Sequence, residues 1–162
     1  MPVGAASWSF TEDDYGAITT ALQRFLFDSN ARCALLVDRA GQLVATVGEQ
    51  PKFDPTAFAT LTAADFSAND QLAKLIGEND FQSLFHQGEK ESMYLADVAR
   101  RVILVVLFDN RTTLGLVRLK MKQTVEELTR LFEQMFERAR SGTNATPNIL
   151  AGADDEIDKL FQ

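Results

Sequence analysis

The stretch ARCALLVDRAGQLVATVG, residues 31–48, contains two short runs of apolar and β-branched residues on either side of a turn sequence. The turn is Asp38-Arg39-Ala40-Gly41, and its glycine can take the positive φ that a hairpin bend requires. Runs of this composition bounded by turn residues are typical of strands. The sequence therefore predicts a β-hairpin here.

A predicted helix lies on each side of this hairpin. Before it, the capping residue Thr11 is followed by three acidic residues, and apolar residues then repeat at helical spacing until a stop near Asn30. After it, Asp54 and Pro55 show the cap and first-turn pattern of a helix start, and Gly77 fits the position after the helix end.

The second of these helices is apolar on two faces. At about 100° per residue, one stripe is expected to face the core. The other side places Phe66 among small residues, where a solvated helix usually carries Lys or Glu. Phe66 therefore has two open interpretations, a contact surface for a partner or burial by another element of the same domain. The expected core stripe consists of Ala57, Leu61, Ala64, Ala68, Leu72 and Leu75.

Three further β-like runs follow at residues 81–87, 92–98 and 101–108, with turns at Gly88 and at Ala99-Arg100. The last run is apolar from Val102 to Phe108, which is typical of a central strand covered on both faces. A long final helix begins at Thr112 or Thr113, and we prefer it to a sixth strand because its apolar stripe is unbroken. That stripe consists of Leu114, Val117, Met121, Val125, Leu128, Phe132 and Met135.

The predicted element order is α-β-β-α-β-β-β-α, an α+β fold with one antiparallel five-stranded sheet flanked by helices. We expect residues 1–9 to be a disordered N-terminus, 10–140 the folded domain and 141–153 a flexible linker. Residues 154–162 form an amphipathic segment in which Ile157, Leu160 and Phe161 share one helical face. Because isolated helices shorter than about 12 residues are marginal in water, this segment must dock to be ordered.

The composition and net charge of the chain exclude several classes of function. The formal net charge of the 162 residues is −7 and no Lys/Arg cluster is present, which argues against nucleic-acid binding. No run is long enough to insert into a membrane, and residues 1–10 do not resemble a signal peptide. Cys33 is the only cysteine, so we expect a buried thiol, no intrachain disulfide and a cytoplasmic protein.

The sequence contains few residues that could catalyse a reaction or bind a metal ion. His86 is the only histidine, and it lacks the second His or nearby Cys that a zinc site would need. The serine-hydrolase, P-loop and dinucleotide-binding motifs are absent. We therefore expect no catalytic residues, no metal site and no cofactor, and a protein that is not an enzyme. Arg39, Arg100 and Arg111 occupy predicted turns, where each could reach a GTPase as an arginine finger, although turn arginines are usually only solvated.

Five segments together resemble the MglB-type polarity regulators of the roadblock/light-chain superfamily: LLVDRAGQLVATVG, LTAADFSANDQLAKLIGEND, FHQGEKESMYL, VILVVLFDNRTTLGLVRLK and DDEIDKLF. The resemblance implies the roadblock fold and a cytoplasmic homodimer, enriched at a cell pole, that activates a Ras-like GTPase of the MglA kind. In such proteins the activator holds the switch regions in place without an arginine finger, and further polarity proteins are additional partners. The alternative is a structural adaptor that binds a GTPase or other polarity proteins without stimulating hydrolysis.

The resemblance also implies which residues bind. It places the C-terminal docking residues Ile157, Leu160 and Phe161 on the GTPase, away from the main contact, with a role in nucleotide exchange. The main partner-binding face lies on the second helix, where this chain has bulkier or more charged residues than the family pattern, a difference expected to alter affinity or partner choice. That face consists of Ala63, Phe66, Ser67, Asp70, Gln71 and Lys74.

Overall fold

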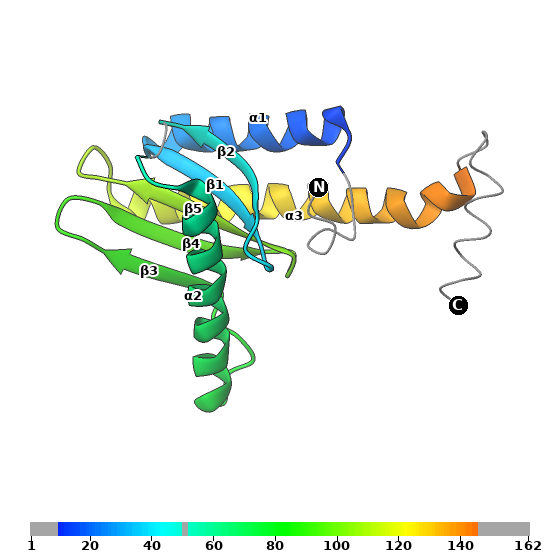
Figure 1. Cartoon of the computed structure of the whole chain (residues 1–162). Coiled ribbons are helices and arrows are strands. Elements are labelled where there is room, and N and C mark those ends of the chain that lie inside the picture. Colours follow the sequence, from blue (N-terminus) through cyan, green and yellow to red (C-terminus); the bar gives the residue numbers. More distant parts are fainter. Residues whose placement is uncertain (1–9, 50–51, 146–162) are drawn as a thin grey trace.

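The computed structural model describes residues 10–49 and 52–145 of the chain. Its elements follow the predicted order α-β-β-α-β-β-β-α, and Figure 1 shows their arrangement. They are α1 (Glu12–Ser29), β1 (Cys33–Asp38), β2 (Leu43–Gly48), α2 (Pro55–Leu75), β3 (Ser83–Gln87), β4 (Ser92–Val98), β5 (Val102–Phe108) and α3 (Leu114–Ala145).

The five strands form one antiparallel sheet in the order β2-β1-β5-β4-β3. The apolar run β5 lies at the centre, as its composition predicts, with β1 and β4 as its neighbours. The two edges are β2 and β3, and β3 is largely exposed. The hairpin turn is confirmed as well, with Gly41 at a φ of +93°.

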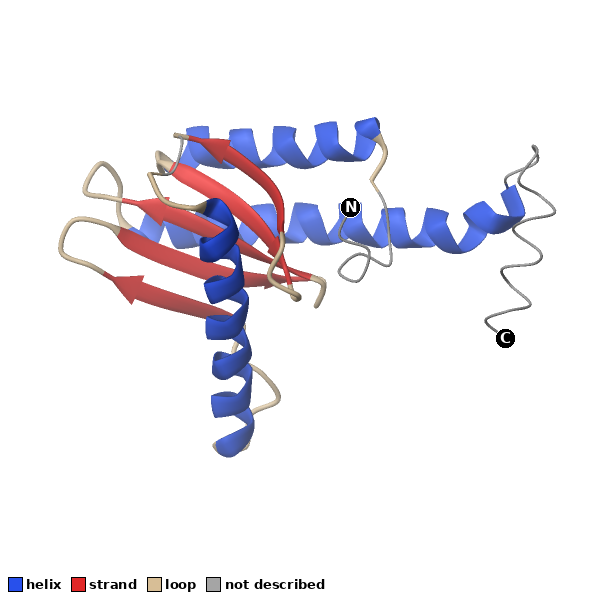
Figure 2. Cartoon of the chain, viewed as in Figure 1, coloured by secondary structure: helices blue, strands red, loops and turns tan. Residues whose placement is uncertain are grey.

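Helices cover both faces of this sheet (Figure 2). Alternate side chains of β1 point to opposite faces, so Ala34 and Leu36 join the core beneath α1 and α3, whereas Leu35 and Val37 join the core beneath α2. The domain therefore has three layers. Among the described residues, no helix is long and apolar enough to cross a membrane.

Helices α1 and α3 begin, and helix α2 ends, where the local sequence pattern predicts. The Thr11 hydroxyl accepts from the Asp14 backbone N–H at 3.0 Å, and the Asp14 carboxylate accepts from the Thr11 backbone N–H at 3.0 Å, which completes a capping box. Thr113, rather than Thr112, caps α3 by accepting from the Leu116 backbone N–H at 3.2 Å. Gly77 follows the end of α2 with a φ of +86°.

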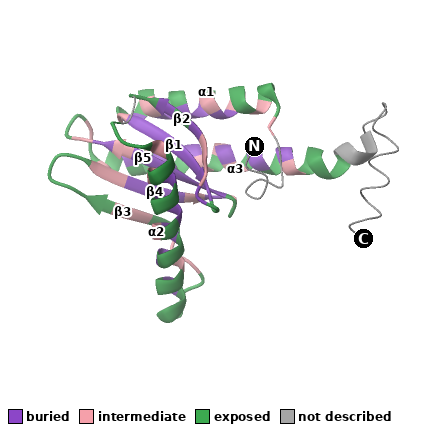
Figure 3. Ribbon diagram, in the orientation of Figure 1, coloured by how far each residue is buried: buried purple, intermediate pink, exposed green. Residues whose placement is uncertain are grey.

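Helix α3 confirms the predicted final helix and extends it. It continues to Ala145, five residues into the range expected to be linker. Its inner stripe is buried or half-buried at every predicted position, while the opposite side is exposed (Figure 3). The expectations for residues 1–9 and 146–162, including the amphipathic C-terminal segment, lie outside the described residues.

Candidate protein interface on helix α2

Helix α2 packs on the sheet with the opposite face from the one predicted. The expected core stripe is exposed in this chain, including Leu61 (69%), Leu72 (57%) and Leu75 (82%), so its assignment to the core was wrong. The helix approaches β1 closely, and small residues permit that approach where leucines would not. The buried face consists of Ala59, Thr62, Ala63, Phe66, Asn69 and Ala73.

Phe66 is the largest side chain of this buried face. It is fully buried among apolar residues of the sheet, including Leu35, Ile103 and Val105. The second interpretation of Phe66 is therefore correct, and the first, a surface contact, is wrong for this chain. Ala63 is 8% exposed and also faces inward. Both residues support the outer face of α2 and are not part of it.

Arg39, in the hairpin turn, links α2 to the sheet through ion pairs. Arg39 Nη1 donates to the Asp70 carboxylate at 2.9 Å, and Nη2 donates to the Asp97 carboxylate on β4. The guanidinium carbon also lies 5.0 Å from the centre of the Phe66 ring. Arg39 is thus held by its own domain, and Asp70 is half-buried in an ion pair.

Two exposed strips remain on α2, and they lie on opposite sides of its outer face. The first, which we call the polar strip, consists of Ser67, Gln71 and Lys74, at spacings of four and three residues. The second, which we call the leucine strip, consists of Leu61, Leu72 and Leu75 and continues into Ile76. Figure 1 shows that the C-terminal end of α2 passes beyond the sheet edge at β3.

His86 connects this edge to α2. Its Nε2 lies 2.6 Å from the Asp65 carboxylate, and both side chains are partly exposed beside the leucine strip. Asp65 could not be identified from the sequence as the partner of His86, because the two residues are far apart in the chain and no local pattern links them. Within the described part of the chain, no group of three or more His, Cys, Asp or Glu side chains could hold a metal ion. His86 therefore joins β3 to α2 through a side-chain hydrogen bond.

The other turn arginines also have carboxylate partners. Arg111 donates to Asp109 at 3.0 Å and to Glu49 at 2.9 Å. The hydrogen bonds from Arg111, followed by those from Arg32, lower the pKa of Glu49. Arg100 is more exposed and lies 3.4 Å from Asp80.

The single thiol is buried, as expected. Cys33 lies at the start of β1 with 3% of its surface exposed. Burial raises the pKa of this thiol, because the charged thiolate loses its hydration there. A buried thiol of this kind is a packing residue and not a nucleophile.

The chain is similar to proteins of known structure over most of its length. Residues 17–108 match the Roadblock/LC7 domain family. MglB of Myxococcus xanthus is 49% identical, with 72% of this chain and 95% of that chain covered and a TM-score of 0.70. The gliding protein MglB of Thermus thermophilus is 35% identical, with coverages of 79% and 97% and a TM-score of 0.73. An MglB with a tetrameric arrangement is 35% identical, with coverages of 80% and 97% and a TM-score of 0.74.

Proposed function

Since the chain belongs to the Roadblock/LC7 family, we propose that it is a homodimeric regulator that activates GTP hydrolysis by a Ras-like GTPase of the MglA kind. Proteins of this family regulate other proteins and are not catalysts themselves. The observation that carries the proposal is the outer face of α2, which presents an apolar strip along one side and a polar strip along the other.

The leucine strip supports the dimer. Complete burial of a leucine contributes roughly 1.5–3 kcal/mol, so covering side chains that are 57–82% exposed contributes about 1–2 kcal/mol each. A two-fold dimer covers six such leucines, which is comparable to the roughly 4–15 kcal/mol that association costs. The adjacent strand β3 has a sheet neighbour on one side only, and a second copy would also pair that edge.

The polar strip supports the contact with the GTPase. Ser67 and Gln71 are short or uncharged and permit close approach, and Lys74 adds a positive charge at the end of the row. Phe66 and Ala63 pack beneath the polar strip and hold it rigid. The ion pair between Arg39 and Asp70 holds the helix in place beside the polar strip. In a two-fold dimer the two α2 helices would form a preorganised platform.

Activation is proposed to work by positioning. Arg39 and Arg111 are engaged by carboxylates of their own domain, which disfavours an arginine finger at either position. Most of phosphoryl-transfer catalysis is positioning and electrostatics, so the platform needs only to bind the active switch conformation better than the resting one. Shifting that equilibrium from 1:99 to 99:1 requires a preference of about 5.5 kcal/mol. The C-terminal residues Ile157, Leu160 and Phe161 are proposed to contact the same GTPase and to promote nucleotide exchange.

Single-turnover GTP hydrolysis by a Ras-like GTPase of the MglA kind tests the proposal. The unaltered chain should speed hydrolysis, and Gln71→Arg should abolish the acceleration while leaving the dimer intact. Gln23→Arg is the matched control, because Gln23 is exposed on α1 across the sheet from α2. Binding to the GTP and GDP forms with equal affinity and no change in rate would instead identify a structural adaptor.

Sedimentation equilibrium tests the dimer separately. Leu72→Arg places a charge in the leucine strip and should give a folded monomer that no longer accelerates hydrolysis. Gln71→Arg should remain dimeric in the same experiment. A wild-type chain that is monomeric at micromolar concentration would contradict the proposed platform.

A further inference from the structure

A groove of about 840 Å³ lies on the face of the sheet opposite α2, between α3 and the strands β3 and β4. Helix α3 packs on β4 and leaves the outermost part of the sheet, at β3, uncovered. Tyr94 and Ala96 of β4 form the floor, and Leu119 of α3 forms part of the wall. The groove does not include any residue of the α2 interface.

The groove combines an apolar interior with a rim that carries charges of both signs. Leu119 is 53% exposed, and the small side chain of Ala96 leaves space above the sheet. Arg118 and Lys122 stand on the same side of α3, and within the described residues neither has an acidic partner at ion-pair distance. The acidic groups at the groove are Asp80, Asp97 and Glu126, of which Asp80 is paired with Arg100 and Asp97 with Arg39.

We propose that this groove binds the chain's own C-terminal segment, Asp154–Gln162. The segment has the complementary pattern, with Ile157, Leu160 and Phe161 on one helical face and four acidic residues around them. The apolar face fits the floor and Leu119, and the acidic residues fit Arg118 and Lys122. The proposal concerns the chain in the absence of the GTPase, which would compete for the same apolar face.

The chain is long enough for this contact. From Thr129, at one end of the groove, α3 continues about 24 Å to Ala145 at roughly 1.5 Å per residue. Residues 146–153 span at most about 26–29 Å when extended, so they can return to Thr129. The segment then runs antiparallel to α3, and its helical length of about 14 Å fits within the roughly 21 Å between Thr129 and Gly115.

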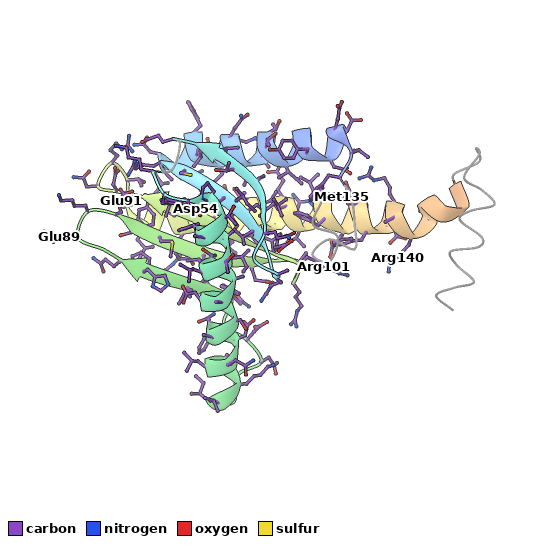
Figure 4. The ribbon with its side chains drawn as sticks, in the orientation of Figure 1. Asp54, Glu89, Glu91, Arg101, Met135 and Arg140 are labelled. Atoms are coloured by element: carbon purple, nitrogen blue, oxygen red, sulfur yellow. The ribbon has the colours of Figure 1, made fainter. Side chains whose placement is uncertain are left out.

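The position of the α3 extension agrees with this path. Figure 4 labels Arg101, in the turn between β4 and β5, at the end of the sheet toward which α3 extends through Met135 and Arg140. Arg100 of the same turn lines the groove. A returning segment therefore meets the open end of the groove first. Tethering gives it a local concentration of the order of millimolar, which allows a short apolar face to bind.

Disulfide trapping in the full chain tests the proposal. In a Cys33→Ala background, Lys122→Cys is combined with Gln162→Cys, and the matched control combines Gln123→Cys with Gln162→Cys. Gln123 is next to Lys122 but lines a different surface of α3, facing α1. Under mild oxidation the first pair should form an intramolecular disulfide at least about tenfold faster than the second.

Equal rates of disulfide formation for the two cysteine pairs would overturn the proposal. Covalent dimers in place of the intramolecular product would also overturn it, because they would show that the groove binds the C-terminal segment of a second chain. A second measurement keeps Cys33 unchanged. The methyl resonances of Ala96 and Leu119 should shift between the wild-type chain and the double variant Ile157→Glu, Phe161→Glu, and unchanged resonances would overturn the proposal.

Discussion

Replacing Phe66 by alanine should destabilise the domain severely, because this side chain is the largest group that α2 inserts into the core. Phe66 is completely buried, and truncating a buried phenylalanine costs about 3–5 kcal/mol of the free energy of unfolding. The loss of the Arg39 contact over the ring adds at most about 1 kcal/mol. At about 2–4 °C per kcal/mol for a chain of this size, the Tm should fall by roughly 6–24 °C.

Leu72→Ala is the matched comparison on the same helix. Leu72 is 57% exposed, so its truncation should change the stability of the folded monomer by less than about 1 kcal/mol and should weaken self-association instead. Urea unfolding followed by circular dichroism, repeated over a range of protein concentrations, separates the two effects. The orientation of α2 described above would be refuted if Phe66→Ala left the midpoint unchanged while Leu72→Ala lowered it at every concentration.

The remaining predictions concern the helix cap and the ionic network. Thr11→Ala removes the capping box and should lower the free energy of unfolding by about 1 kcal/mol, whereas Thr11→Ser should retain the capping box. Equal midpoints of urea unfolding for the two variants would contradict the role of the cap. Hydrogen bonds from Arg111 and Arg32 lower the pKa of Glu49. The stability that these bonds give the folded state is therefore complete above pH 4.5, the ordinary pKa of this carboxyl group, and is lost as the pH falls through its lower pKa in the folded state. Arg111→Gln should therefore reduce the dependence of stability on pH below 4.5 in acid titrations followed by circular dichroism, and an unchanged profile would show that the network does not contribute.

Most of the fold could be predicted because its signals are local. The hairpin turn requires a glycine at positive φ, the capping box joins residues three positions apart, and the α3 stripe repeats over many turns of one helix. Each signal is decided within a few residues of the chain. The element order and the central position of β5 follow from these signals, and the similarity to MglB agrees with them.

The pairing of distant residues was not predictable in the same way. The contacts of Arg39 with Asp97 and of His86 with Asp65 join residues that are 58 and 21 positions apart. No local pattern marks such pairs, because each partner alone looks like a solvated charge. Only the assembled sheet brings the hairpin turn, α2 and the edge strand β3 close together.

The sequence by itself determined that α2 is a helix with two apolar faces, but it could not determine which face meets the sheet. Periodicity reports the spacing of apolar side chains along a helix and carries no information about the surface on the other side. The tertiary structure selected the face with Ala59, Ala63 and Phe66, since small residues let the helix approach β1 and one large ring fills the remaining space. The leucines predicted to be core were left outside, where a second copy of the chain can cover them.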